Sequence, residues 1–287
     1  MSKRHPILAF LGAIWKVIDG IARLAINLLV IFFVVLVIGF LFSPSAPRVP
    51  SSAALVLAPA GNLVEQLAGN PLDRAIGTIV GDVEPQTRVR DLVDAIQAAR
   101  DDDRIEVLVL DLDEMFGAGL SKLQTIGIAI EDFKTSGKKV IALGDAYSQN
   151  QYYLAAYADE IYMHPMGIVF MQGYGRFRMY YKEAIDKLGI DWNVFKVGEY
   201  KSFVEPYTRQ DMSAEDRASS LAWLTDLWEA YQQDVDRNRA LEPGSVERYV
   251  TGFVDDLEQV HGDFSAIALE HGLVDELRDR VQMRERM

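Results

Sequence analysis

The sequence has no cysteine and only four histidines, and these two shortages remove several kinds of catalytic chemistry. Without cysteine there is no catalytic thiol, no cysteine-ligated zinc site and no disulfide framework. No two histidines have the HxxxH spacing that places a pair of metal ligands on one face of a helix. A histidine-based triad is therefore poorly supported, and hydrolytic chemistry would need another base. We expect neither a metal nor a cofactor.

Positive charge is also in short supply. The chain has 29 Lys and Arg against 42 Asp and Glu, which gives a net charge of -13. A broad nucleic-acid surface needs clustered Lys and Arg, so we expect no nucleic-acid partner. The plainest interpretation of the acidity is solubility. Because 49% of the residues are hydrophobic and 25% are charged, the chain can bury a sizeable core.

One long apolar run lies near the N-terminus. Residues 24–42 read LAINLLVIFFVVLVIGFLF, nineteen residues without a charge. About 20 apolar residues cross a hydrocarbon core of roughly 30 Å, so the run predicts a transmembrane anchor. The alternative is a cleaved signal peptide, whose apolar core has only about 7–15 residues and lies closer to the N-terminus. The length of the run favours the uncleaved anchor.

The charges beside this run predict its orientation. The cations that precede it are Lys3, Arg4, Lys16 and Arg23, whereas the nearest cation after it is Arg48. The positive-inside rule then places residues 1–23 in the cytoplasm and the chain after the span outside it. Within the basic N-terminus, residues 7–23 are apolar with interspersed cations, which is typical of an interfacial helix that leads into the span.

After the span the chain divides into a linker and a domain. Residues 43–52, SPSAPRVPSS, contain three prolines and four serines and predict a short stiff linker. Residues 53–287 predict one globular domain in which strands alternate with helices. The expected strands are 53–57, 105–112, 139–143, 160–163, 168–171 and 192–197. The expected helices are 89–100, 120–133, 151–157, 180–188 and 213–239. This alternation predicts βαβ units and an α/β fold with a mostly parallel sheet.

Lys201 is the candidate base. It follows the strand predicted at 192–197, and ligands of α/β proteins bind outside the carboxyl ends of strands. A lysine acts as a general base only where an apolar site lowers its pKa from about 10.4 toward 7–8. The aromatic neighbours that could form such a site are Tyr200, Phe203 and Tyr207. Glu199 and Glu205 would instead favour the charged form. From the residue alone, an exposed loop lysine in an ion pair is the more ordinary interpretation.

Three other segments contain residues that could take part in catalysis or binding. Ser148 lies in the strand-to-helix turn of residues 144–159, where a nucleophile elbow would belong, but its expected role is to cap the helix. Residues 111–119, DLDEMFGAG, contain several acids, but their spacing matches no recognised carboxylate cage, and they predict a loop. Residues 167–175 contain three glycines that do not form a nucleotide-binding motif, so turns between strands are expected.

Two long segments resemble the signal peptide peptidase A family. Residues 198–213, GEYKSFVEPYTRQDMS, run into a long helix with Trp223 and Trp228 and are very similar to the family's lysine motif. Residues 147–167, YSQNQYYLAAYADEIYMHPMG, resemble the N-terminal copy of the family's serine-site segment. The resemblance covers nearly the whole chain, including the membrane span and the strand at 105–112.

The resemblance implies a ClpP/crotonase-like fold and a serine endopeptidase with a Ser-Lys dyad. It implies a single-pass protein of the bacterial inner membrane, in contact with its lipid, with the peptidase domain in the periplasm. The implied substrates are cleaved signal peptides and other short hydrophobic peptides, and the implied assembly is a homotetramer. The family's long form is a tandem duplication. Its first copy supplies a general-base lysine, which maps onto Lys201, and its second copy supplies the serine.

The serine of the family's one-domain short form has no counterpart in this sequence. Aligning Tyr152 and Tyr153 with the tyrosines of the family's SGGYY-type segment puts Gln149 at the serine position. Asn150 and Gln151 replace the paired glycines, which would let the backbone approach a substrate. The chain therefore matches the first copy of the long form, and we expect the serine-bearing copy to lie outside it.

Two other functions remain open. The missing serine is compatible with a non-catalytic, membrane-tethered pseudoprotease that binds peptides or scaffolds an oligomer. A crotonase-type enzyme acting on acyl-CoA comes last, because the predicted placement of the domain outside the cytoplasm separates it from CoA thioesters.

Overall fold

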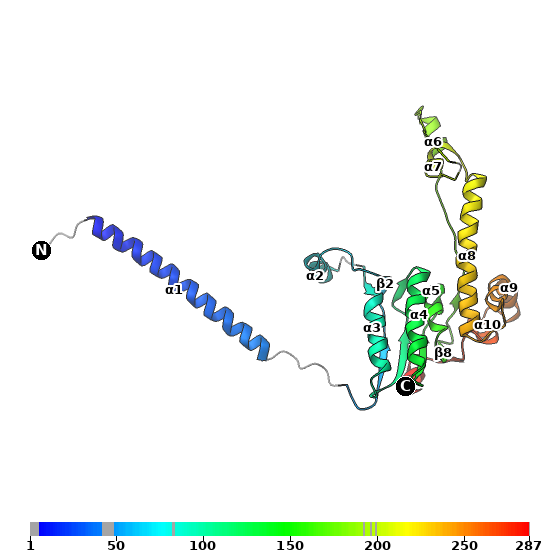
Figure 1. Ribbon diagram of the computed structural model, residues 1–287, viewed down its shortest axis with the longest axis horizontal. Coiled ribbons are helices and arrows are strands. Elements are labelled where there is room, and N and C mark those ends of the chain that lie inside the picture. Colours follow the sequence, from blue (N-terminus) through cyan, green and yellow to red (C-terminus); the bar gives the residue numbers. More distant parts are fainter. Residues whose placement is uncertain are drawn as a thin grey trace. The chain divides into compact units, whose positions relative to one another are not determined.

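The computed structural model describes residues 6–41, 49–81, 84–191, 193–195, 197–198 and 200–286. Contacts divide the chain into two compact units, Met1–Val49 and Pro50–Met287. The first unit contains helix α1, and the second contains the sheets and helices α2 to α11 (Figure 1). The linker expected at residues 43–52 falls largely outside the described residues.

Helix α1 is one continuous helix, Pro6–Leu41, of 36 residues. The expected interfacial helix and the expected span are therefore parts of a single element, and Phe42, the last residue of the expected span, lies outside the described residues. Within α1 the stretch Ile14–Phe40 is long and apolar enough to cross a membrane, judged by length and composition. Asp19 and Arg23, one turn apart, form an ion pair at 2.8 Å. The helix is compatible with a membrane-anchored protein.

Every strand pairing found among the described residues of the second unit is parallel, as expected for βαβ units. The main sheet has the order β1-β4-β6-β8-β10. Its strands are β1 Ala53–Leu57, β4 Ile105–Asp111, β6 Lys139–Gly144, β8 Glu160–Met163 and β10 Glu276–Leu277. A second sheet has the order β3-β2-β5, and β7 pairs with β9. These strands are β2 Gly61–Val64, β3 Gln86–Arg88, β5 Met115–Gly117, β7 Tyr147–Ser148 and β9 Val169–Phe170.

The central strands are buried on both faces, which explains their continuous apolar runs. Leu108 and Leu110 belong to the large core formed with α3 and α4. Val109, which alternates with them, belongs to a smaller cluster on the opposite face that includes Met283 of α11. Successive side chains of a strand point to opposite faces, so a strand covered on both sides needs apolar residues at every position.

The helices largely match the pattern of apolar residues in the sequence. They are α2 Pro71–Val80, α3 Val89–Arg100, α4 Leu120–Lys134, α5 Gln149–Ala155, α6 Lys182–Lys187, α7 Glu205–Thr208, α8 Ala214–Asn238, α9 Ser245–Gln259, α10 Phe264–Glu270 and α11 Arg280–Arg286. Ser213 is the N-cap of α8, as predicted: its side chain accepts a hydrogen bond from the backbone N–H of Asp216. The α/β fold with mostly parallel sheets is confirmed.

Two expectations about individual elements are wrong. The strand predicted at 192–197 is absent from the described residues 193–195 and 197. Its apolar side chains have no sheet to pack on, and Phe195 is 100% exposed. Trp192 and Lys196 lie outside the described residues. The loop predicted at 111–119 contains strand β5, because β2 offers it a parallel partner.

A glycine in α4 sets how closely this helix approaches the segment after α5. A Cβ atom added at Gly127 would lie 2.3 Å from Cζ of Tyr157, which is buried. Gly127→Ala should gain about 1 kcal/mol of helix propensity. The overlap with a buried ring should cost about 1–3 kcal/mol or more. We therefore expect a lower melting temperature in a thermal unfolding experiment.

Gly252→Ala, in α9, is the matched control. Its added Cβ would come no closer than 3.4 Å, to the side-chain oxygen Oδ2 of Asp256. This variant should be at least as stable as the wild type. A Gly127→Ala protein that melts no lower than the wild type would contradict the close packing of α4 described above.

Candidate functional site

Lys201 lies in a long segment, residues 172–212, that leaves the core after β9 and leads into α8, which reaches the core at Tyr231 and Val235. We call this segment the extension; it contains α6 and α7 and stands above α8 in Figure 1. Between Met171 and Ser213 the only described residue that is buried is Glu205, a carboxylate. The extension therefore has no apolar core of its own among its described residues, and polar contacts must hold it in place.

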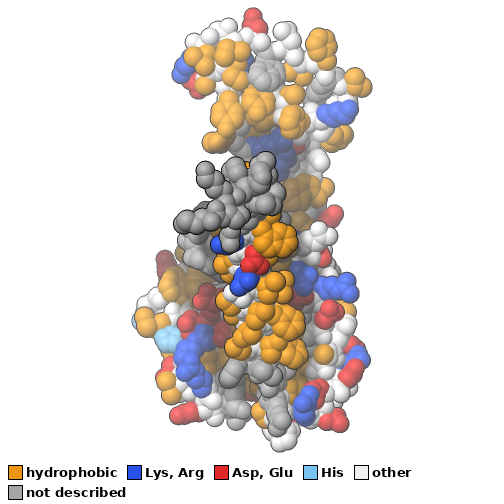
Figure 2. Space-filling view, turned by 90° about the vertical axis from the view of Figure 1, so that its left-hand side faces the viewer, with side chains coloured by type: hydrophobic (Ala, Val, Ile, Leu, Met, Phe, Trp, Pro, Cys, Tyr) orange, Lys and Arg blue, Asp and Glu red, His pale blue; other side chains and the backbone are white. Residues whose placement is uncertain are grey.

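The extension exposes large apolar side chains instead of burying them. Phe177, Phe195 and Phe203 are 95%, 100% and 80% exposed, respectively. Hydrophobic side chains gather at the top of Figure 2, where α6 and α7 lie. Apolar patches of this kind on a protein surface mark contacts with another protein or with a membrane.

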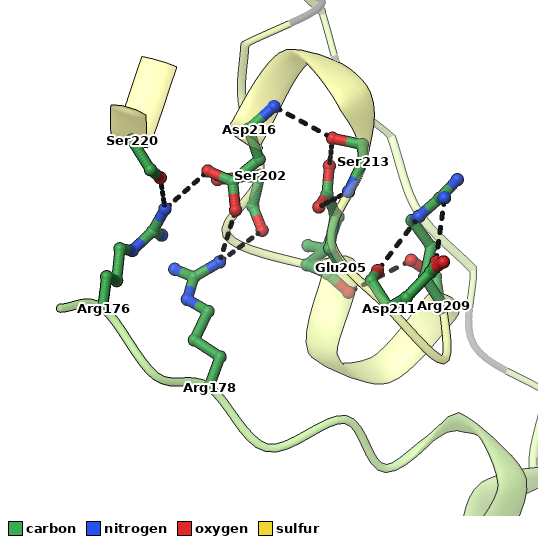
Figure 3. A network of polar contacts seen from close by, with 11 residues as sticks. Arg176, Arg178, Ser202, Glu205, Arg209, Asp211, Ser213, Asp216 and Ser220 are labelled. Atoms are coloured by element: carbon green, nitrogen blue, oxygen red, sulfur yellow. Dashed lines mark hydrogen bonds and ion pairs between the residues drawn. The ribbon is translucent and has the colours of Figure 1, made fainter. Parts of the chain in front are cut away.

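A buried carboxylate at the start of α8 anchors the extension (Figure 3). Asp216 is 4% exposed, and its Oδ1 accepts hydrogen bonds from Arg176 Nη1 at 2.8 Å and from Ser202 Oγ at 2.6 Å. Arg178 Nη1 lies 3.7 Å from the second carboxylate oxygen and donates to the main-chain oxygen of Ser202 at 3.1 Å. The network fixes the residue that directly follows Lys201.

The charges in this network keep Asp216 ionised. Burial by itself would raise the pKa of Asp216, but the hydrogen bonds from Arg176 and Ser202 and the positive charges of Arg176 and Arg178 together hold it below its usual value. A buried charge is tolerated where such partners compensate the loss of hydration.

Glu205 completes the junction between the extension and α8. Its carboxylate accepts hydrogen bonds from the backbone N–H of Ser213 at 3.1 Å and from the hydroxyl of Ser213 at 2.6 Å. Ser213 in turn accepts from the N–H of Asp216 at 3.1 Å. The sequence predicts that Ser213 and Asp216 cap the start of α8 together. In the structure the backbone N–H of Ser213 donates to Glu205, and the Asp216 carboxylate binds Arg176 and Arg178 instead.

Lys201 itself lies exposed on the extension. Its aliphatic stem passes close to Gly198, where an added Cβ would lie 3.8 Å from Lys201 Cε. Gly198 has a φ of 103°, a conformation that side chains with a Cβ rarely adopt. Lys201 Nζ makes no hydrogen bond or ion pair to any of the residues that the structure describes. The backbone turn beside the lysine therefore depends on glycine.

The aromatic side chains that the sequence places near Lys201 do not enclose it. Tyr200 and Phe203 are 66% and 80% exposed, and Tyr207 stacks on Tyr181 with ring centroids 6.1 Å apart. Of the two expected acidic neighbours, Glu205 is engaged by Ser213, and Glu199 lies outside the described residues. The described part of the chain does not by itself provide the apolar site that a neutral lysine needs.

Ser148 and Gln149 lie elsewhere, at the start of α5. Ser148 occupies the N-cap position, and its backbone N–H donates to Gln151 Oε1 at 2.7 Å. The two residues form a capping box, in which the buried Ser148 Oγ faces the backbone N–H of Gln151. Gln151 Nε2 also donates to the main-chain oxygens of Leu112 and Met115, each at 2.9 Å. Gln151, which replaces a glycine of the family pattern, thus ties α5 to the connection between β4 and β5.

Two acids of the segment 111–119, Asp111 and Asp113, form ion pairs. Arg280, at the start of α11, contacts Asp111 at 3.4 Å, Asp145 at 2.8 Å and also Asp113. The part of the chain that the structure describes contains no group of three or more potential ligands that could hold a metal ion. These acids therefore fasten α11 to the carboxyl ends of β4 and β6.

Comparison with known proteins gives the family. The model of peptidase family S49 matches residues 132–287, more than half of the chain. Protease 4 of Salmonella typhi is 36% identical over 278 residues, which cover 94% of this chain and 45% of the relative. Protease 4 of Haemophilus influenzae is 38% identical over 283 residues, which cover 95% of this chain and 45% of the relative.

Among solved structures, the 1510-N membrane-bound stomatin-specific protease is similar at a TM-score of 0.40 and 14% identity, over 82% of this chain and 84% of that one. The chain spans less than half the length of the two Protease 4 relatives that it matches. The family model covers the catalytic-lysine candidate, its anchoring network and the start of α5, and on this match the chain belongs to peptidase family S49.

Proposed function

We propose that this chain supplies the general-base lysine of a membrane-anchored Ser-Lys endopeptidase that degrades cleaved signal peptides and other short hydrophobic peptides. The observation that carries the proposal is the position of Lys201. It lies exposed on an apolar extension, and the buried Asp216 network fixes the residue beside it. A lysine held in this way is available to a second surface that brings a serine and excludes water.

The chemistry follows from the requirements of a lysine base. An ammonium group becomes a neutral amine near pH 7 only when burial disfavours its charge. We propose that a serine-bearing α/β domain outside residues 1–287 covers Lys201 and the neighbouring exposed aromatic side chains. The amine then takes the proton from the serine hydroxyl as the oxygen attacks the peptide carbonyl, and it returns that proton to the leaving amine.

The same apolar surface supports an oligomer. Exposed side chains as large as Phe177 and Phe195 are unfavourable in water, and a neighbouring subunit or domain would bury them. We propose that several copies assemble through the extension, as a homotetramer by resemblance to the family. The partners are thus other copies of the protein, the inner-membrane lipid around α1 and the peptide substrates.

The membrane placement follows from α1 and its flanking charges. We propose a single span in the bacterial inner membrane, with the N-terminus in the cytoplasm and the unit Pro50–Met287 in the periplasm. Lysines and arginines precede the apolar stretch of α1, in agreement with the positive-inside rule. A periplasmic position would bring the unit to signal peptides released at the membrane.

A non-catalytic scaffold is the second candidate, and one observation favours it. Gln149 stands at the position that the family's short form gives to serine, and its side-chain oxygen is already held by the backbone N–H groups of Gln172 and Gly173. Peptidase activity of the 287-residue chain that disappears in Lys201→Ala would exclude the scaffold.

Replacing the lysine tests the proposal in the natural protein purified from its membrane. Lys201→Ala should lower kcat/KM for an apolar peptide by about 10³-fold, within the range that general-base catalysis supplies. Lys187→Ala is the control, since Lys187 is an exposed lysine of the same extension that pairs with Glu183. It should leave kcat/KM within about twofold, well below the tenfold that 1.4 kcal/mol represents. Equal activity of the wild type and Lys201→Ala would refute the proposed role.

Asp216 should act as a positioning residue for Lys201. Asp216→Asn keeps one acceptor oxygen but removes the negative charge that Arg176 and Arg178 contact, and hydrogen bonds to charged groups contribute about 1.5–3 kcal/mol each. We expect a lower kcat with little change in KM, and faster amide exchange around Ser202. The ionised Asp216 has a pKa below 3.8 in the folded state, so its contribution to stability is present at neutral pH and fades as the pH falls through that pKa. A stability difference between the two proteins that grows on acidification would contradict this account.

The absence of cysteine permits a clean test of orientation. Ser219 lies exposed on α8, and Ser219→Cys introduces a single thiol into the chain. A maleimide that cannot cross the inner membrane should label this thiol in cells with a permeabilised outer membrane. Ser2→Cys, before α1, should be labelled only after lysis. The reverse pattern would overturn the proposed topology.

A further inference from the structure

A cleft lies where the short strands β5, β7 and β9 meet the first residues of the extension. Its volume is about 340 Å³, within the range of about 300–1,000 Å³ typical of ligand sites. It is lined by Phe116, Ala118, Ser148, Gln149, Asn150, Phe170, Gln172, Gly173 and Tyr174. The three short strands follow β4, β6 and β8, so the cleft lies at the carboxyl edge of the main sheet, where α/β proteins bind ligands.

The polar groups of the cleft are suited to amides. Gln149 Oε1 accepts hydrogen bonds from the backbone N–H groups of Gln172 at 3.1 Å and of Gly173 at 2.9 Å. Two consecutive N–H groups thus point to one position, where they bind an amide oxygen. Ser148 Oγ and Tyr174 OH are buried at the wall of the cleft, where Ser148 belongs to the capping box with Gln151 and Tyr174 OH lies near the Gln149 side chain. Each hydroxyl can both donate and accept a hydrogen bond, so this wall suits a ligand with donors and acceptors.

Phe116, Ala118 and Phe170 form the apolar part of the wall, and no lining residue is charged. Phe116 and Phe170 are 61% and 49% exposed, and each lies on a strand at the edge of its sheet. An edge strand presents backbone groups to which an extended peptide can add. The combination of edge backbone, amide side chains and two aromatic rings is matched by a peptide in extended conformation with uncharged, apolar side chains.

We propose that this cleft binds an extended apolar peptide segment without cleaving it. Ser148 and Tyr174 would pair with the peptide's main-chain groups, and Phe116 and Phe170 would pack against its side chains. No titratable base lines the cleft, so the contact is binding alone. The inference rests on the proposed peptidase function, because the cleft would hold one stretch of a substrate while another is cleaved beside Lys201.

Peptide binding to the full 287-residue chain in lipid nanodiscs tests the inference. The probe is an acetylated, amidated hexapeptide of alternating Leu and Ala with a fluorescent label, followed by fluorescence anisotropy. The wild type should bind it saturably. Phe116→Ala combined with Phe170→Ala should weaken binding at least tenfold, because aromatic anchors dominate such contacts. Ile128→Ala combined with Val254→Ala removes apolar groups of similar exposure, 64% and 67%, away from the cleft and should leave the affinity unchanged.

Two further variants separate the cleft from the catalytic proposal. Gln149→Glu keeps an acceptor for the two N–H groups but adds a charge to an uncharged cleft, so the affinity should fall at least fivefold. Lys201→Ala should bind as tightly as the wild type, because Lys201 does not line the cleft. No saturable binding, or equal binding by the Phe116/Phe170 variant, overturns the inference even if Lys201→Ala abolishes peptidase activity. Saturable binding by the wild type, with weaker binding by the Phe116/Phe170 and Gln149→Glu variants, supports the inference whatever the peptidase activity of Lys201→Ala.

Discussion

The position of the candidate base depends on one buried carboxylate. Asp216 gathers Arg176, Arg178 and Ser202 from the extension onto the start of α8. No apolar side chain of the extension is fully buried among its described residues. This polar network therefore holds the extension in place, as a hydrophobic core would in another domain. The extension can then present its aromatic side chains and Lys201 outward without collapsing onto the domain.

The structure separates two surfaces that a one-domain protease would combine. The carboxyl edge of the sheet carries a cleft built from amides, hydroxyls and aromatic rings, without a base. The extension carries a lysine without a nucleophile among its described neighbours. Gln149, whose side-chain oxygen accepts hydrogen bonds from two backbone N–H groups, stands where the family resemblance would place a serine. This division is the basis of our proposal that a second α/β domain supplies the serine, and the chain spans less than half the length of its two Protease 4 relatives.

The sequence predicts much of the sheet-and-helix domain and less of the site. Helix α3 and strand β1 have the predicted bounds, because helical spacing and short apolar runs are local signals. The partners of Asp216 were not predicted, since Arg176 precedes it by 40 residues and nothing local links them. The mostly apolar residues 192–197 predict a strand of this domain. An apolar pattern indicates that a face is covered, but it does not identify the segment or subunit that covers it. Within this chain nothing covers Phe195, which is fully exposed among the described residues.

A structure of the natural protein in its membrane tests the central claim most directly. The quantity to measure is the distance from Lys201 Nζ to the nearest serine Oγ outside residues 1–287. The account predicts a hydrogen-bond distance of about 2.6–3.2 Å, as a base and its nucleophile require, with Phe195 and Phe203 buried in the same interface. A Lys201 that remains in solvent, with no serine near it and the aromatic side chains still exposed, would contradict the account.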